Sequence, residues 1–369
     1  MPSHRPNPDD PQQAALRRTL HRRGFLGVAA GASAAALLGT GAAPAYAAPH
    51  GTQPAAPATP ARPPARHPFH RPVLPPGRLG IQLYTLRDQT SSLGFARVFE
   101  ELARYGYDEV EFAGYTQGSA GAITLRRIKR LLRDNGLRGI GSHVGYASAD
   151  PTAYTFATAL TKVLDDAESL GLPYVGTPSV PDRYGNTVDA WKRAAAEFNA
   201  YGAAARARGM RFYHHNHAEE FAFATDDPRV RLYDVLLAET DPRLVFFEMD
   251  IFWAYVAQYR FSRRPDGTPA PFEPLDYVLA APARYPLFHV KDGEHDTATQ
   301  DGYRMVDVGD GDIDYRRFLS AVERRRGRRS AHWIVERDDA VDPAANPAGS
   351  LSTARRSARH LRSLRAPHG

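Results

Sequence analysis

One stretch organises the rest of this chain: RFYHHNHAEEF, residues 211–221. It begins as a short aromatic strand and ends in His214, His215 and His217, which two carboxylates follow. Because a buried polar group costs free energy unless it has a partner, imidazoles at the end of a buried strand need partners. A metal ion is one such partner, since neutral imidazole is a common metal ligand. The alternative is a polar loop with histidines bonded to the backbone, and this stretch alone does not separate the two.

The sequence on both sides of this strand repeats one pattern, in which short apolar stretches alternate with stretches of helical spacing. The expected strands are 80–84, 108–112, 139–144, 174–177, 211–216, 244–250, 287–290 and 333–336. The expected helices are 95–105, 124–135, 152–170, 187–208, 232–238, 275–283, 315–325 and 351–364. Such alternation favours parallel strands with right-handed crossovers, and eight units predict a single (β/α)8 barrel, an α/β fold. An open doubly wound sheet is the alternative, but no glycine-rich phosphate motif follows the first strand.

Ionisable side chains stand at the ends of most predicted strands. The active site of such a barrel is built at the carboxyl ends of its strands. These ends carry Glu111, His143, His215, His217, Asp250, His289, Lys291 and Glu336. The pattern predicts a polar site at one mouth, either a metal site or a buried salt-bridge network.

Several motifs in this region resemble the xylose isomerase-like (β/α)8 barrels, a family described broadly as sugar phosphate isomerases and epimerases. The motifs are HNH at 215–217, MDIFW at 249–253, HVKD at 289–292, VGDGDID at 308–314 and VERD at 335–338. The resemblance covers residues 78–364, and we expect the barrel at 79–366. It implies one divalent metal ion held by His215, Asp250, His289 and Glu336. Many family members have a glutamate in strand five, so His214 and His217 stay open as alternatives to His215.

The ligand types indicate which metals the site would accept. Two imidazoles and two carboxylates suit transition metals better than Ca²⁺. We expect Mn²⁺ first, with Co²⁺, Zn²⁺, Fe²⁺ and Mg²⁺ as alternatives.

Other residues at the predicted mouth are candidates for catalysis and binding. Lys291 shares a strand face with His289, because side chains two positions apart point the same way. It would hold an oxyanion or act as acid or base, or else form an ion pair. His143 and Glu111 are further catalytic candidates; the alternatives are a hydrogen-bonded core histidine and a helix cap. The substrate-binding candidates are Tyr84 and Trp253 as apolar walls, His217, and Asn216 through its hydrogen bonds.

The first 78 residues differ from the rest. Residues 1–47 read as an export signal, with Arg22-Arg23, a run rich in alanine and glycine, and the cleavage pattern AYA at 45–47. The arginine pair resembles a twin-arginine signal, so we expect a secreted or periplasmic protein with the twin-arginine export machinery as a partner. The apolar run is short for a stable membrane anchor. Residues 48–78 are predicted to form a disordered linker rich in proline and alanine.

Composition argues against other classes of protein. The 369 residues include no cysteine, which excludes disulfides and thiolate metal sites. The net charge is +6, and residues 1–47, with five arginines and two aspartates, carry half of it. The remainder is too weakly basic to indicate nucleic-acid binding.

Together these features predict an exported, metal-dependent sugar isomerase or epimerase. The metal would polarise a carbonyl of a small carbohydrate and stabilise the enediolate formed when a base removes the neighbouring proton. We expect an unphosphorylated sugar or keto-sugar, because an exported enzyme rarely meets sugar phosphates.

Three alternatives to this function stay open. They are a 3-keto-glycoside lyase or hydrolase at the same site, a non-catalytic secreted carbohydrate-binding barrel, and a phosphodiesterase of the endonuclease IV type. The weakly basic mature chain argues against the last, which would need a basic groove. The family resemblance also implies a homodimer.

Overall fold

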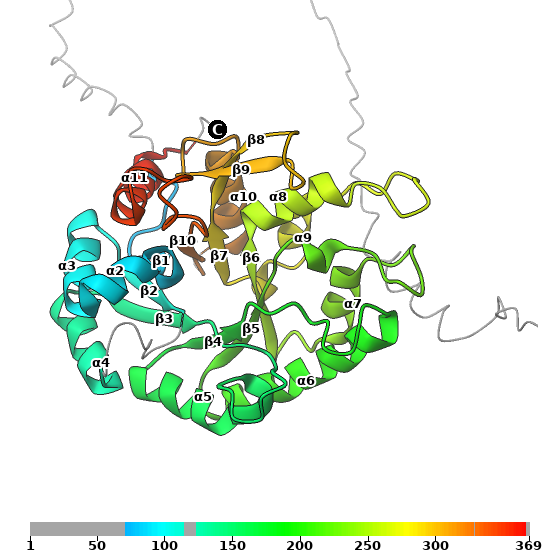
Figure 1. Cartoon of the computed structure of the whole chain (residues 1–369), viewed down its shortest axis with the longest axis horizontal. Helices are drawn as coiled ribbons and strands as arrows, with labels where there is room; N and C mark the ends of the chain where they lie inside the picture. Colours follow the sequence, from blue (N-terminus) through cyan, green and yellow to red (C-terminus); the bar gives the residue numbers. More distant parts are fainter. Residues whose placement is uncertain (1–70, 114–122, 328, 367–369) are drawn as a thin grey trace, which may run out of the picture. The chain divides into compact units, whose positions relative to one another are not determined.

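Eight parallel strands form the centre of the fold in the computed structural model, which describes residues 71–113, 123–327 and 329–366. The strands are β1 (Leu79–Gln82), β2 (Glu109–Phe112), β3 (Arg138–Ser142), β4 (Tyr174–Thr177), β5 (Arg211–His215), β6 (Val245–Asp250), β7 (Leu287–Val290) and β10 (His332–Val335). Their order in the sheet is β3-β2-β1-β10-β7-β6-β5-β4, and every pairing is parallel. The predicted (β/α)8 barrel is confirmed (Figure 1).

The two edge strands of this order, β3 and β4, meet and nearly close the barrel. Just beyond β3, His143 forms a parallel bridge with Gly176 of β4, and the Val144 N–H donates to the Gly176 carbonyl at 2.8 Å. A side chain at Gly176 would not fit, because its Cβ would lie 2.4 Å from the Tyr213 carbonyl oxygen. Closure brings the carboxyl ends of all eight strands around one mouth.

Two separate apolar clusters fill the fold, because successive residues of a strand point to opposite faces. The larger cluster lies between the barrel and its helices. The smaller one fills the barrel interior and comprises Ile140, Tyr174, Tyr213, Leu287 and Ile334. Strand β2 adds an inward carboxylate at each end, with Glu109 near the amino end and Glu111 near the carboxyl end.

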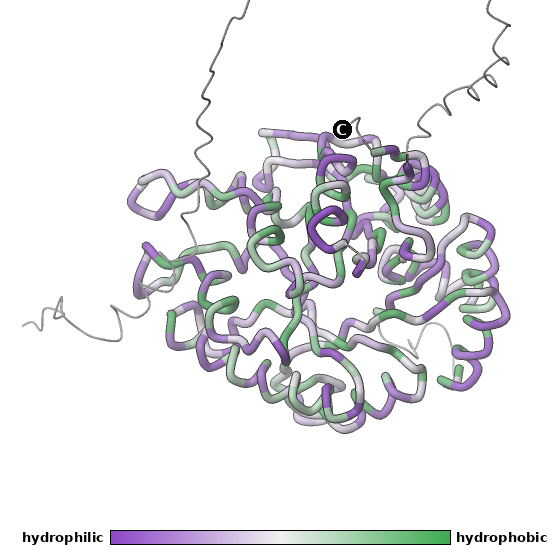
Figure 2. The backbone as a smooth tube through the Cα atoms, turned by 180° about the vertical axis from the view of Figure 1, so that it is seen from behind, coloured by the Kyte–Doolittle hydropathy of each residue, from purple (hydrophilic) through white to green (hydrophobic). Residues whose placement is uncertain are grey.

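Helices surround the barrel (Figure 1). The helices that follow the strands are α3 (Gly94–Tyr105), α4 (Leu125–Asp134), α5 (Phe156–Leu170), α6 (Val188–Ala207), α7 (Leu232–Glu239), α9 (Pro274–Ala280), α10 (Tyr315–Arg326) and α11 (Ser350–Ser363). Thr124, Thr155 and Thr187 each cap a helix by accepting a backbone N–H three residues later. Hydrophilic and hydrophobic residues alternate along these helices, which lets each turn an apolar side towards the barrel (Figure 2).

The helix after β3 begins later than predicted. The sequence analysis placed its start at Thr152, whereas α5 begins at Phe156. The backbone N–H and hydroxyl of Thr152 both donate to Asp150 Oδ1, at 2.8 and 2.7 Å. Such a local side-chain turn competes with helix formation, so the helix starts only at the next cap, Thr155.

Several elements were not predicted from the sequence. They are α2 (Arg87–Ser92), α8 (Ile251–Arg260), the antiparallel hairpin of β8 (Asp292–His295) and β9 (Tyr303–Val306), and the short 3-10 turns η1 (Leu83–Leu86), η3 (Glu219–Phe221) and η4 (Pro282–Arg284). Helix α8 starts directly where β6 ends, because the Asp250 carboxylate accepts the Trp253 N–H at 2.9 Å and caps it.

The predicted export signal and most of the predicted linker lie outside the described residues. The end of that linker, residues 71–78, is described, and it packs against the barrel. Val73 and Leu74 are buried, and the Val73 N–H donates to the Leu364 carbonyl at 3.2 Å. Within the described ranges, no helix combines the length and the apolar character needed to cross a bilayer.

Candidate metal centre

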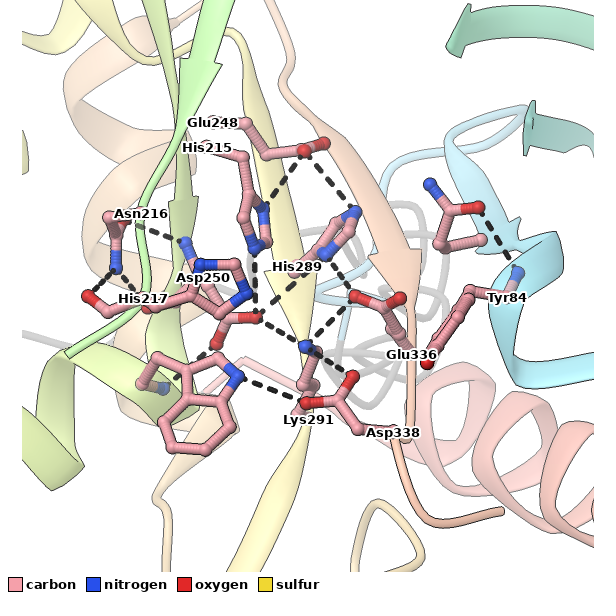
Figure 3. Close-up of polar contacts among 12 residues, drawn as sticks. Tyr84, His215, Asn216, His217, Glu248, Asp250, His289, Lys291, Glu336 and Asp338 are labelled. Atoms are coloured by element: carbon pink, nitrogen blue, oxygen red, sulfur yellow. Dashed lines mark hydrogen bonds and ion pairs between the residues drawn. The ribbon is translucent and has the colours of Figure 1, made fainter. Parts of the chain in front are cut away.

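Four side chains from neighbouring strands meet at the carboxyl mouth of the barrel (Figure 3). His215 ends β5, Asp250 ends β6, His289 lies in β7 and Glu336 follows β10. Each offers one ligand atom, and these atoms all lie within 4.8 Å of one another. All four side chains are buried. The residues that the family resemblance implied as metal ligands are therefore brought together.

The contacts within this group fit a divalent cation. His289 Nδ1 lies 2.6 Å from Glu336 Oε2 and 3.8 Å from Asp250 Oδ2, and His215 Nε2 lies 3.7 Å from Asp250 Oδ2. Asp250 Oδ2 and His289 Nδ1 are buried, and their close partners in the described part of the chain are ion-pair partners: Lys291 Nζ lies 2.9 Å from the first and Glu336 Oε2 lies 2.6 Å from the second. A cation held between these atoms would have both as ligands. Two imidazoles and two carboxylates are also typical of transition-metal sites.

A second group of four overlaps the first. His143, His215, Glu248 and His289 also offer ligand atoms within 4.8 Å of one another. Glu248 is fully buried, and its Oε2 lies 2.9 Å from His143 Nε2 and 3.2 Å from His215 Nδ1. Burial and the neighbouring Glu111 raise the pKa of Glu248 to about 7. Both groups reach the cavity described below through two residues, His215 and Glu336 in the first and His143 and His215 in the second. We place the candidate ion in the first group, because its members are the four ligands that the family resemblance implies.

Lys291 joins three carboxylates at the edge of this centre. Its Nζ lies 2.9 Å from Asp250 Oδ2, 2.9 Å from Glu336 Oε2 and 2.8 Å from Asp338 Oδ1. Burial alone would lower the pKa of Lys291, but these carboxylates raise it well above 10.5, so the side chain is an ammonium. Burial acts to raise the pKa of Glu336, but Lys291 and His289 outweigh it and hold that pKa well below 4.5.

The two histidines of the first group have opposite electrostatic settings. Burial lowers the pKa of His215 well below 6.5, and the neighbouring His289 and His143 lower it further, so His215 is the neutral imidazole that metals bind. Burial also acts to lower the pKa of His289, but Glu248, Glu336 and Glu111 raise it well above 6.5. The carboxylates around His289 thus favour positive charge, which a bound cation would supply.

Side-chain alternation decides which histidine of residues 214–217 reaches the group. His215 points into the barrel. His214 points to the opposite face, where its ring centroid lies 5.4 Å from that of Phe198 and its Nε2 lies 3.4 Å from Glu220 Oε1. The ring centroid of His217 lies 5.0 Å from that of His215. Of the three histidines left open by the sequence, the structure brings His215 into the four-residue group.

A cavity of about 470 Å³ lies over this group, a volume typical of small-molecule sites. Its lining includes five of the predicted catalytic and substrate-binding residues: Tyr84, His143, His217, Trp253 and Lys291. Asn216 and Glu111 are not among the lining residues. Asn216 accepts the Asp250 N–H at 3.1 Å and donates to its carbonyl at 3.3 Å, so it orients the end of β6. Glu111 contacts His289 Nε2 at 2.6 Å from beneath and accepts from Gln82 at 2.8 Å.

Comparisons with known proteins agree with this geometry. The family model described as "Xylose isomerase-like TIM barrel" matches residues 99–364. The chain belongs to this family. No curated protein matched the chain.

Solved structures of similar fold include three instructive cases. A sugar phosphate isomerase/epimerase from Parabacteroides distasonis is 22% identical, with 78% of this chain and 94% of that chain covered and a TM-score of 0.58. The IolI protein with a bound zinc atom is 14% identical, with 79% and 100% covered and a TM-score of 0.57. A xylose isomerase domain protein from Alicyclobacillus acidocaldarius is 18% identical, with 78% and 97% covered and a TM-score of 0.54. At such identities these likenesses show the fold alone.

Sequence reasoning missed several residues of this xylose isomerase-like site. Asp338 accepts from Lys291 and, through Oδ2, from Trp253 Nε1 at 3.0 Å. Glu248 lies beneath the mouth, and Tyr213 donates its hydroxyl to Glu111. Each of these residues stands two positions from a predicted ligand or catalytic residue along the chain: Tyr213 from His215 in β5, Glu248 from Asp250 in β6, and Asp338 from Glu336 after β10. For the two strand residues, alternation along the strand was the signal available.

Proposed function

We propose that this protein is a metal-dependent sugar isomerase or epimerase that acts on an unphosphorylated sugar or keto-sugar. The observation that carries the proposal is the convergence of His215, Asp250, His289 and Glu336 within 4.8 Å, under a cavity of about 470 Å³. The fold shared with a sugar phosphate isomerase/epimerase and with zinc-bound IolI supports both the reaction class and a divalent metal. We expect Mn²⁺ before Zn²⁺, Co²⁺, Fe²⁺ or Mg²⁺.

The charges of the cavity favour a substrate without phosphate. Among the described residues that line it, Lys291 is the one lysine or arginine, and three carboxylates already contact its ammonium group. A phosphate placed away from the bound ion would therefore face Glu336 and Asp338 without a cation of its own. The neutral hydroxyl and carbonyl oxygens of a sugar carry no such penalty.

The bound ion would polarise a substrate carbonyl and make the adjacent C–H more acidic. The positive charge of Lys291 would stabilise the negative charge that develops on the substrate oxygen through the electrostatic field, because its three N–H groups already contact carboxylates. His143 is the candidate acid and base: its Nε2 contacts Glu248 Oε2 at 2.9 Å, which leaves Nδ1 to take the proton from one carbon and return it to the other face or to the neighbouring carbon. Burial acts to lower the pKa of His143, but Glu111 and Glu248 outweigh it and raise that pKa. Tyr84 and Trp253 form the walls against which the sugar ring packs.

Elemental analysis and substrate assays test this proposal together. We expect the purified protein to bind about one divalent metal ion per chain and to interconvert free ketoses or their epimers. Asp250→Ala and His289→Ala should lose the metal. His217→Ala is the matched control, because His217 lines the cavity outside the four-residue group, and it should keep the metal while losing activity.

Two results would overturn the proposal. Protein that binds no divalent metal, and whose sugar binding is unaffected by chelator, would indicate a carbohydrate-binding barrel. Release of an aglycone from a 3-keto-glycoside, with no change of free ketoses, would replace isomerisation by a lyase or hydrolase reaction at the same site.

A further inference from the structure

A second cavity, of about 930 Å³, lies at the opposite end of the barrel from the candidate metal centre. Five of the strand residues that line it are the first residues of their strands: Glu109 of β2, Arg138 of β3, Tyr174 of β4, Arg211 of β5 and His332 of β10. Nothing in the proposed reaction uses this end of the barrel. Its volume lies within the range of ligand-binding pockets.

Helix α4 supplies one wall of this cavity and fills it with positive charge. Arg126, Lys129, Arg130 and Arg133 all line the cavity from this one helix, and all four side chains are exposed. Arg133 has Asp134 as a partner at 3.0 Å. No carboxylate of the described residues lies within ion-pair distance of the other three.

The strand ends supply the facing wall, which is also cationic. Arg78, Arg138 and Arg211 line it, together with Glu109, the single carboxylate among the described lining residues. That carboxylate is already satisfied: His332 Nδ1 lies 2.6 Å from its Oε2 and Arg138 donates to its Oε1 at 2.8 Å. Glu109 therefore neutralises part of its own wall and leaves the charge of α4 unbalanced.

Unbalanced cations on two walls of a concavity concentrate a positive potential between them. Several linked anionic groups would match cations spread over two walls better than one small anion would. Six of the seven cations are arginines, and the planar guanidinium group matches the oxygens of a phosphate in a two-point contact.

We propose that this cavity is a binding site for a small polyanion that carries several phosphate groups. The site is separate from the candidate metal centre, and its occupancy does not depend on the reaction proposed there. Arg126 and Arg130, which no described carboxylate neutralises, would contact the phosphates from α4, and Arg211 would contact them from β5.

Calorimetric titration of the full chain with inorganic tripolyphosphate at constant ionic strength tests this proposal. Arg130→Glu should weaken binding about tenfold or more, because it replaces a charge-assisted contact by repulsion. Arg127→Glu is the matched control: Arg127 is exposed on the same helix, lies outside the cavity lining and changes the net charge equally. It should weaken binding less than about twofold. Circular dichroism of both variants checks that α4 stays folded.

Four outcomes would overturn the proposal. One is the absence of saturable binding by the wild-type protein. Another is an equal loss of affinity in Arg130→Glu and Arg127→Glu, which would indicate general attraction to net charge. A third is binding that survives both changes, which would place the ligand elsewhere, including at the metal mouth. The fourth is tighter binding of citrate than of tripolyphosphate, which would reject the phosphate preference.

Discussion

Replacing Lys291 by methionine tests how the carboxylates of the mouth are held together. The Lys291 Nζ contacts oxygens of Asp250, Glu336 and Asp338 at 2.8 to 2.9 Å, and the side chain is only 2% exposed. Methionine has a similar length and no charge, so Lys291→Met would leave three acid groups facing one another without their cation. Breaking a buried ion pair by removing one partner costs about 3–5 kcal/mol. We expect a comparable loss in the free energy of unfolding and a fall in Tm of about 10 °C.

The assay is a urea titration followed by tryptophan fluorescence, with chelator present so that no bound ion replaces the lost charge. Lys162→Met is the control, because Lys162 Nζ contacts Asp166 at 2.8 Å but its side chain is 67% exposed. A surface pair of this kind contributes roughly 0–1 kcal/mol. A loss in Lys291→Met no larger than in Lys162→Met would refute the reasoning. Adding Mn²⁺ should recover part of the stability, because a cation at Asp250 and Glu336 restores positive charge.

Three other residues lead to testable predictions. Burial raises the pKa of Asp292 from 3.8 to about 6. Its contribution to stability is therefore complete below pH 3.8 and is lost as pH rises through 6. Urea titrations should show that the free energy of unfolding of the wild type falls by about 3 kcal/mol relative to that of Asp292→Asn between pH 4 and pH 7. Asp338→Asn should lower kcat about tenfold with little change in KM, because Asp338 positions Lys291 at 2.8 Å; steady-state kinetics measure this. Gly176→Ala should cost about 3 kcal/mol or more in a urea titration, because the added Cβ would lie 2.4 Å from a backbone carbonyl oxygen.

Each of these expectations has an outcome that contradicts it. Asp241, whose pKa is about 2, stays ionised between pH 4 and pH 7. If the stability of the wild type relative to Asp241→Asn changed with pH as much as its stability relative to Asp292→Asn, the burial argument would be contradicted. Unchanged kcat in Asp338→Asn would show that Lys291 needs no positioning. In Gly145→Ala the new Cβ meets only Thr155, at 3.4 Å, and should cost less than about 1 kcal/mol. Equal losses in Gly176→Ala and Gly145→Ala would contradict the close approach at β4.

Strand β5 shows how much of the site could be predicted from the sequence. The apolar run Phe212-Tyr213 and the polar end at His215 were enough to place the strand and its end. Alternation along β5 places His214 and His215 on opposite faces of the strand. It does not say which of the two faces the barrel interior, because that depends on how β5 pairs with its neighbouring strands. Here Phe198 and Phe247 surround His214 on the outer face.

Two of the elements missed by the sequence analysis lack a local sequence signal, for different reasons. Helix α8 follows β6 without a loop, because Asp250 is both the end of the strand and the cap of the helix. The pattern around it reads as one apolar run, with no turn residue to mark the change. The hairpin of β8 and β9 is short, and only Asp292 and Gly293 of it are buried, so it lacks the hydrophobic period that indicates a strand.

By itself the sequence determined the eightfold alternation of strands and helices, and hence a barrel with its ionisable groups at the strand ends, because both follow from local hydrophobic period. Only the tertiary structure decided that His215, Asp250, His289 and Glu336 share one point, that Lys291 is fixed among three acids, and that α4 faces the strand starts across a cationic cavity. Those distances join residues far apart in the chain. They are set by barrel closure and strand register, which no local pattern encodes.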